Sequence, residues 1–343
     1  ACEVNPSDAK AHYYLGNLWY DKRQYSNAIE EWELSAKKDA SFPTVLRNLG
    51  IAYFNKQNNP QKALEYFEKA FVLDKSDGRV LMELNQLYKR LNYKPEAQLA
   101  FLEENLQTAE LRDDVYLERA AIYNFIGQYD KAYKLIMDRQ FHPWEGGEGR
   151  VSGQHIFSLV EMAKKNISAG NFKEAIDQLE QAQVYPHNLG EGKLFGAQEN
   201  DIFYWIGCAY EGMGEEEKAK NFWQKATLGL SEPSAAMFYN DQQPDKIFYQ
   251  GLAWKKLGDH EKATMIFEKL ADYGNNHLED EVKIDYFAVS LPDLLIFEDN
   301  LKLRNITHCY YIMGLGYLGL NNYNESITAF NKAAVKLWKR EPV

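Results

Sequence analysis

The sequence is poor in cysteine, with three residues in 343, and the three have no close spacing. Cys2, Cys208 and Cys309 therefore form neither a disulfide framework nor the paired ligands of a structural zinc site. The chain also lacks any apolar run approaching the roughly 18 residues that a membrane-spanning helix needs. It has no basic run either, and its net charge of -11 argues against binding to nucleic-acid phosphates.

Signatures of catalysis are missing as well. The sequence contains no nucleophile elbow, phosphate loop or H-E-x-x-H pair. The letters GLGYLG at 314–319 match a dinucleotide fingerprint, but no strand precedes them and their glycines belong to a helical pattern. We therefore expect no cofactor, no metal ion and no catalytic residue in this chain. Free thiols inside helical patterns favour a reducing compartment such as the bacterial cytoplasm, and a periplasmic location stays open.

One residue pattern recurs along most of the chain. Each copy has a small residue, an aromatic residue three positions later, alanine or serine about nine positions after that, and a large apolar residue four further on. The clearest copies are Gly16/Trp19/Ala28/Trp32, Gly50/Tyr53/Ala63/Phe67, Gly207/Tyr210/Ala219/Trp223, Gly251/Trp254/Ala263/Phe267 and Gly314/Tyr317/Ser326/Phe330. Steps of three and four keep side chains on one helical face, so small residues let two antiparallel helices approach while large ones fill the gap.

This pattern predicts an all-α fold, a right-handed superhelix (α-solenoid) of about eight helical hairpins. A single hairpin cannot bury its apolar faces, so neighbouring hairpins must stack. We expect four near-regular repeats in 1–141, three extended repeats with inserted loops in 142–272, an apolar insertion in 273–306 and a last repeat in 307–343. The opening EVNPSD (3–8) reads as the end of an earlier helix and a turn, which predicts a fragment of a longer protein.

The recurring small and aromatic positions resemble the tetratricopeptide repeat, over about eight hairpins and most of the chain. The resemblance implies a concave groove, lined by the first helices, that holds a protein segment. If the small residue is the eighth position of each first helix, the residues placed in the groove are Tyr13, Asn17, Arg47, Asn48, Arg79, Tyr204, Phe248 and Tyr311, with Phe54 as a neighbour.

The family's clamp for a peptide carboxylate is matched only in part. Asn17, Asn48 and Arg79 fit it, but Tyr13 and Glu83 stand at two positions where basic residues belong. An aromatic groove of mixed charge favours an internal segment, an apolar peptide or another domain. The alternative is that these large side chains only tighten the superhelix.

Two inserted loops carry related sequences, HPWEGGEG at 142–149 and HNLGEG at 187–192. Glycine and proline give such loops a defined shape. We predict a binding site for sugar hydroxyls or a protein loop, built from an apolar platform, carboxylate acceptors and imidazole donors: Trp144, Glu145, Glu148, Glu191, His142 and His187. Metal binding by these side chains would require the two loops to converge. The alternative is that the loops only close the extended repeats.

The segment IDYFAVSLPDLLIF at 284–297 is strongly apolar. Since a solvated linker would be polar, we expect a buried strap lying across the solenoid. Together with the loop motifs and HCYYIMGLGYLGL (308–320), it makes residues 140–320 resemble the C-terminal region of a family of large bacterial proteins of unknown function. In that family a β-rich module similar to galactose mutarotase precedes tetratricopeptide repeats.

Two functions therefore stay open. The first is a scaffold that binds a protein segment, or another domain of a larger bacterial protein. The second, implied by the narrower resemblance, is an accessory region of a carbohydrate-active enzyme that contributes loop residues to a sugar site. In that case Glu145 and Glu148 would be the acids nearest the sugar, although both lie in one loop.

Overall fold

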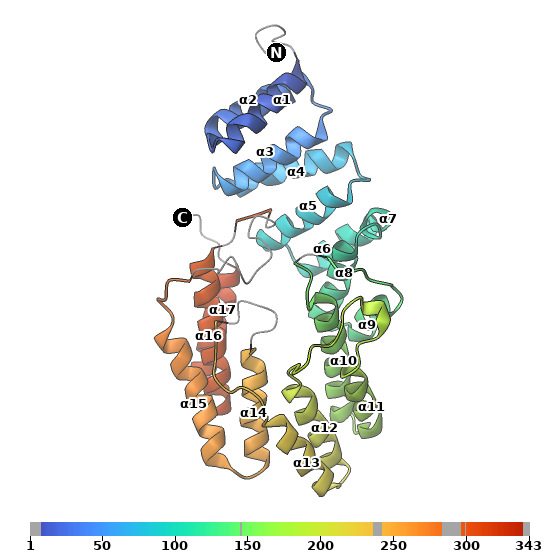
Figure 1. Ribbon diagram of the computed structural model, residues 1–343, viewed down its shortest axis with the longest axis vertical. Coiled ribbons are helices and arrows are strands. Elements are labelled where there is room, and N and C mark those ends of the chain that lie inside the picture. Colours follow the sequence, from blue (N-terminus) through green and yellow to red (C-terminus); the bar gives the residue numbers. More distant parts are fainter. Residues whose placement is uncertain (1–7, 145, 236–241, 283–295, 299, 339–343) are drawn as a thin grey trace. The chain divides into compact units, whose positions relative to one another are not determined.

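The chain folds into helices joined by turns and loops (Figure 1). The computed structural model describes residues 8–144, 146–235, 242–282, 296–298 and 300–338, and these contain α-helices, one short 3-10 helix and no strand. The chain divides into two compact units. The N-terminal unit comprises residues 1–122, 293–299 and 341–343, and the C-terminal unit comprises 123–292 and 300–340.

The N-terminal unit consists of consecutive helical hairpins. Its helices are α1 (Ala9–Asp21), α2 (Tyr25–Lys38), α3 (Pro43–Asn55), α4 (Pro60–Leu73), α5 (Gly78–Arg90), α6 (Pro95–Glu104), α7 (Leu106–Ala109) and most of α8 (Asp113–Phe125). Local chemistry sets their starts. The carboxylates of Asp8 and Asp77 accept backbone N–H groups of α1 and α5, and proline opens α3, α4 and α6.

The C-terminal unit continues with longer connections between hairpins. It contains α9 (Tyr129–Met137), α10 (Arg150–Ser168), α11 (Phe172–Ala182), the 3-10 helix η1 (His187–Leu189), α12 (Asn200–Gly212), α13 (Glu216–Ala226), α14 (Pro244–Lys256), α15 (His260–Asn276), α16 (Leu301–Gly319) and α17 (Tyr323–Trp338). Each insertion follows the second helix of one hairpin, as the sequence predicted. Figure 1 shows α14, α15, α16 and α17 side by side.

Small residues meet large ones between the two helices of a hairpin. A Cβ atom added to Gly16 would lie 2.4 Å from Cδ1 of Trp32, and one added to Gly207 would lie 2.4 Å from Nε1 of Trp223. Gly314 likewise lies against the ring of Phe330 in α17, where a Cβ atom would overlap it. These pairs are the positions that recur in the sequence, so the predicted all-α solenoid of stacked hairpins is confirmed.

The predicted blocks 1–141, 142–272, 273–306 and 307–343 are defined by repeat length, whereas the two compact units are defined by packing. The blocks therefore stay a prediction. Most of the expected apolar strap, residues 283–295, lies outside the described residues. Phe297, near its end, is 1% exposed and belongs to the core of the N-terminal unit. In the described part of the chain no helix is long and apolar enough to cross a membrane.

Candidate functional site

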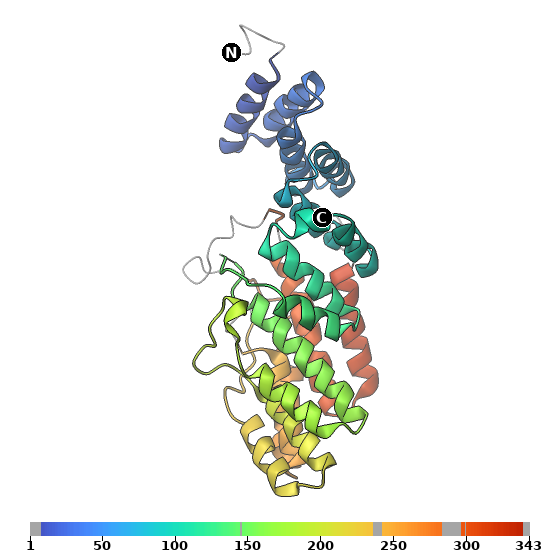
Figure 2. The same ribbon diagram turned by 90° about the vertical axis from the view of Figure 1, so that its right-hand side faces the viewer.

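The two glycine-rich loops lie against each other in the C-terminal unit (Figure 2). The N–H of Phe141 donates to the carbonyl of Asn188 at 2.8 Å. Gly190, with a φ of +68°, approaches the carbonyl of Phe141 so closely that a Cβ would lie 2.6 Å from its oxygen. Phe141 and Leu189 are both 1% exposed. The loops therefore converge around a small apolar centre of their own.

Two side chains of the second loop complete helix ends. Asn188 Nδ2 donates to the carbonyl of Ile136 at 2.9 Å, near the end of α9. Glu191 accepts the N–H groups of Val151 and Ser152, each at 3.2 Å, in the first turn of α10. Helix ends leave such groups without intrahelical partners, and a carboxylate also suits the positive end of the helix dipole. Glu191 is thus engaged in helix capping.

The other predicted loop residues are placed as follows. His142, Glu148 and His187 are exposed, and Glu145 lies outside the described residues. The ring of Trp144 lies against Gly147, where a Cβ would overlap it. Within the described residues no three His, Cys, Asp or Glu side chains gather closely enough to hold a metal ion. Among the described residues of the two loops, His142, Glu148 and His187 thus present polar groups to solvent.

In the N-terminal unit, the predicted groove residues bind one another. Nε and Nη2 of Arg47 donate to the two carboxylate oxygens of Glu83 at 2.6 and 2.5 Å, and Glu83 is fully buried. Burial raises the pKa of Glu83, and the hydrogen bonds and charge of Arg47 oppose that rise. The exposed Arg79 adds a weaker opposing charge. Arg47 therefore serves the core rather than a free carboxylate.

The remaining groove residues of this unit are also engaged. Asn17 Oδ1 accepts the indole N–H of Trp32 at 3.0 Å and lies 3.5 Å from Nδ2 of Asn48. The ring of Tyr13 packs 4.9 Å from that of Phe42. These contacts support the alternative that large groove residues tighten the array.

The first helices of the C-terminal unit bear the other three predicted groove residues. Tyr204 is 9% exposed and its ring lies 5.4 Å from that of Tyr249. Phe248 packs 5.6 Å from Phe267. Tyr311 remains 39% exposed, and so is the most accessible of the three.

An ion pair that was not predicted from the sequence lies beside these rings. Lys246 Nζ lies 2.5 Å from Asp201 Oδ1, and their side chains are 16% and 10% exposed. Burial alone would lower the pKa of Lys246, but the charges of Asp201 and Asp245 outweigh it and the pKa is raised. Asp201 and Asp245 both occupy the second position of a first helix, where Arg79 stands in α5. Lys246 is therefore engaged with acidic side chains of the fold rather than with a peptide carboxylate.

A more specific arrangement occurs in the N-terminal unit, at residues 296–298. Asn55, the last residue of α3, donates from Nδ2 to the carbonyl of Ile296 at 2.7 Å and accepts the N–H of Glu298 at 2.9 Å. Arg90, the last residue of α5, donates to the carbonyls of Phe297 and Glu298, each at 3.2 Å. Every one of these bonds is to the backbone of the segment.

The side chains of Phe297 and Glu298 also contact residues of the N-terminal unit. The ring of Phe297 lies 4.8 Å from Phe54 and 5.6 Å from Phe67, both in edge-on geometry. The carboxylate of Glu298 pairs with Lys56. Burial alone would lower the pKa of Lys56, but the hydrogen bond and charge of Glu298 outweigh it and the pKa is raised.

Asn55 and Arg90 are the thirteenth positions of consecutive first helices when the small residues Gly50 and Asn85 are the eighth. The sequence predicted Phe54 as a groove neighbour, but not Asn55 or Arg90. The signal that could have found them is a pair of long polar side chains at equivalent places in adjoining repeats.

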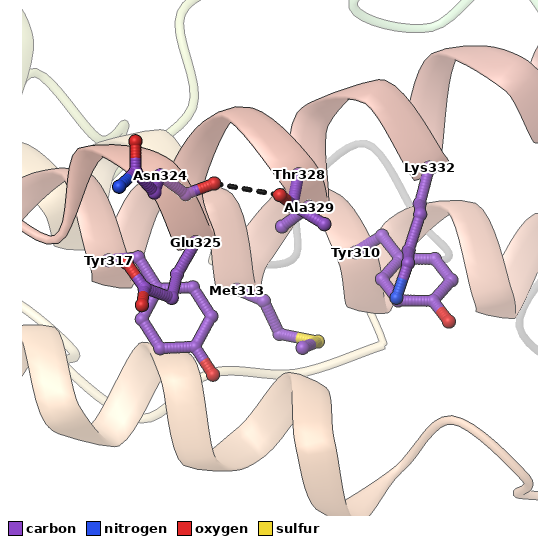
Figure 3. Close-up of a pocket in the computed structure, with 8 residues that line it drawn as sticks. All are labelled: Tyr310, Met313, Tyr317, Asn324, Glu325, Thr328, Ala329 and Lys332. Carbon is purple, nitrogen blue, oxygen red and sulfur yellow. Dashed lines mark hydrogen bonds between the residues drawn. The ribbon is translucent and has the colours of Figure 1, made fainter.

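A separate hollow of about 280 Å³ lies on the last hairpin, between α16 and α17. Figure 3 shows Met313 at its centre and Lys332 over the ring of Tyr310, 5.1 Å from the ring centroid. Thr328 is held by a hydrogen bond to the carbonyl of Asn324, at 2.8 Å. The hollow is shallow, and the two charged side chains that line it, Glu325 and Lys332, are exposed to solvent.

The fold defines a helical-repeat protein, an α-solenoid of paired helices. The tetratricopeptide repeat pattern matches residues 1–44, 201–228 and 307–334, which contain α1–α2, α12–α13 and α16–α17. The chain therefore contains tetratricopeptide repeats, as its small and aromatic positions predicted.

Known proteins resemble parts of the chain. Tetratricopeptide repeat protein 37 of Xenopus laevis is 26% identical over 213 residues, or 53% of this chain and 14% of that protein. The type IV pilus assembly protein PilF of Pseudomonas aeruginosa is 32% identical over 87 residues, or 24% of this chain and 34% of PilF. The chain thus spans well under two thirds of the length of these curated relatives.

Among solved structures, the apo form of the quorum sensor NprR from B. thuringiensis is similar to 96% of this chain, over 87% of its own length. The sequence identity is 14% and the TM-score is 0.43, so the likeness carries no argument about function. None of these three proteins is described as carrying a mutarotase-like module, and that part of the predicted resemblance stays a prediction.

Proposed function

We propose that the chain is a protein-interaction scaffold that holds a polypeptide segment by its backbone against the first helices of its repeats. Tetratricopeptide repeats are typical of proteins that bind other proteins. The observation that carries the proposal is the pair of hydrogen bonds from Asn55 to the carbonyl of Ile296 and from the N–H of Glu298 to Asn55. Together they satisfy one carbonyl and one N–H group of the segment's backbone.

Backbone recognition matters because every polypeptide offers the same N–H and C=O groups. A surface that pairs with them can receive segments of different sequence, and side-chain pockets then select among them. The partner is another polypeptide, either a separate protein or a further domain of a longer bacterial protein.

A contribution of the edge loops to a sugar site stays a prediction. Trp144, Glu148 and His187 remain at the surface, but Glu191 is engaged at the start of α10. Since no described pocket gathers these groups, the scaffold is the function that the geometry favours.

Selection of binding peptides from a random 12-residue display library on the full chain tests the scaffold. We expect selected peptides whose binding weakens when Tyr311→Ala or Asn55→Ala changes a first helix. The matched control is Phe195→Ala, which removes a fully exposed ring from the edge loop. A failure to select any peptide, or ligands that respond only to Phe195→Ala, contradicts the proposal.

A further inference from the structure

We infer that the ends of α3 and α5 form a binding site for a peptide with an aromatic residue followed by an acidic one, and that the chain's own segment 296–298, with Phe297 and Glu298 at these two positions, is its resident occupant. A polypeptide with the same order would bind by displacing residues 296–298. This inference rests on the proposed function and adds to it the ligand's sequence and the competition within the chain.

The backbone contacts of the ligand follow from the hydrogen bonds. Asn55 reaches the carbonyl of one residue and the N–H of the residue two positions later, where the segment bends. Arg90 approaches the intervening and following carbonyls, at 3.2 Å each. Asn55 and Arg90 come from equivalent positions of neighbouring repeats. The spacing of the repeats therefore sets the length of peptide backbone that the two side chains bind.

The aromatic preference follows from the pocket. Phe297 is 1% exposed and lies between Phe54 on α3 and Phe67 on α4. The guanidinium of Arg90 lies 5.6 Å from the ring centroid of Phe297, so the ring also meets a cation. An aromatic ring in this place gains edge-on ring contacts that an aliphatic side chain would not make.

The acidic preference follows from Lys56. This side chain is 19% exposed and pairs with the carboxylate of Glu298, which is itself 58% exposed. A lysine at the ligand's acidic position would place two ammonium groups together. The charge therefore selects for Glu or Asp without requiring that the ligand's side chain be buried.

The occupant is tethered to the site that it fills. Because both are in one chain, residues 296–298 act at a high effective concentration, and a peptide in solution competes poorly with them. The contacts with Glu298 are the accessible part of the occupied site, whereas Phe297 is enclosed. Weakening either contact should open the site to a peptide added in trans.

Fluorescence anisotropy with a labelled peptide of residues 294–300, LLIFEDN, tests the inference on the full chain. The double variant Phe297→Ala/Glu298→Lys removes the resident ring and repels Lys56. We expect it to bind the peptide at least about tenfold more tightly than the wild-type chain does. Adding Asn55→Ala to that variant should weaken binding by about tenfold, because two hydrogen bonds are lost. Asn27→Ala, on the exposed side of α2, is the matched control and should change nothing.

Peptide variants test the sequence preference. LLIAEDN and LLIFKDN should each bind the double variant at least about fivefold more weakly than LLIFEDN. If the double variant does not fold, judged by circular dichroism, the single change Glu298→Lys replaces it, with a several-fold gain expected over wild type.

The inference is overturned if a folded variant does not bind LLIFEDN at about 1 mM, or binds LLIAEDN equally well. Residues 296–298 are then only part of the core. If library peptides still bind a first-helix face in that case, the proposed function stands and only this inference fails. If no ligand responds to any first-helix change, the proposed function itself fails.

Discussion

The carboxylate of Glu191 lies 3.2 Å from the backbone nitrogen of Ser152, in the first turn of a helix that begins at Arg150. The loop motif that suggested a ligand site therefore closes the first turn of α10. Its glycines allow the close approach of the two loops, and its glutamate satisfies N–H groups that the helix cannot.

Replacement of Glu191 by Ala should lower the free energy of unfolding by about 1 kcal/mol, the usual effect of removing a helix cap. The measurement is urea unfolding followed by circular dichroism. Glu148→Ala, an exposed change in the partner loop, is the control and should shift stability by less than about 0.5 kcal/mol. Equal effects of the two changes would show that Glu191 does not act as a cap.

The small positions of the repeat should not tolerate a methyl group. A Cβ on Gly50 would lie 2.6 Å from Cδ2 of Phe67 and 3.2 Å from the carbonyl oxygen of Ala63. We expect Gly50→Ala to reduce the free energy of unfolding by about 1–3 kcal/mol, since overpacking forces the ring or the helices to move.

Gly153→Ala provides the matched control for this test. Gly153 lies inside α10 with open space around its Cα, so alanine should leave stability unchanged or raise it by up to about 1 kcal/mol. Thermal or urea unfolding measures both variants. A Gly50→Ala chain as stable as Gly153→Ala would contradict the close packing of the hairpins.

Removal of Arg47 should lower the free energy of unfolding, because the buried carboxylate of Glu83 loses its partner. Arg47→Ala leaves a fully buried carboxylate without its bidentate partner and should cost about 3–5 kcal/mol. Arg79→Ala, at an exposed position of α5, should cost much less. Urea unfolding near neutral pH compares the two.

The same variant should depend on pH in a defined direction. The pKa of Glu83 is raised by burial, and loss of Arg47 removes the main opposing influence, so the pKa rises further. A raised folded-state pKa favours protonation on folding, and the associated stability is lost as pH rises through that pKa. The stability gap between wild type and Arg47→Ala should therefore shrink as pH falls from about 7 to about 5. A gap that widens in acid would contradict this account.

The two described cysteines should be poor nucleophiles. Cys309 is fully buried, and burial raises its pKa to about 11. Burial also raises the pKa of Cys208. In a Cys2→Ser chain, we expect reaction with a disulfide reagent at about pH 8 to be on the order of a hundredfold slower than for a free thiol. Rapid labelling of either thiol in the folded chain would show that the helices around it open readily.

The hairpins could be predicted because their signal is local. Gly16 and Trp32, for example, lie within one hairpin, and the same spacing recurs at Gly207 and Trp223. The insertions were predicted for the same reason, since they appear as changes in the interval between repeats.

The candidate site could be predicted only in part because its contacts join distant residues. The apolar character of 284–297 predicted burial, and the aromatic groove favoured an internal segment, but neither identified Asn55, which lies more than two hundred residues earlier. The role of Glu191 was missed because a glycine-rich loop says nothing of the helix end that it meets. The types of side chain in a sequence do not show which distant residues come into contact when the repeats stack.

Hydrogen exchange at the amide of Glu298, resolved by mass spectrometry with electron-transfer fragmentation, tests most directly whether the first helices hold a polypeptide segment by its backbone. In the wild-type chain we expect this amide, which donates to Asn55 at 2.9 Å, to exchange at least about tenfold more slowly than in Asn55→Ala. Equally fast exchange in both chains would mean that residues 296–298 are not held on α3.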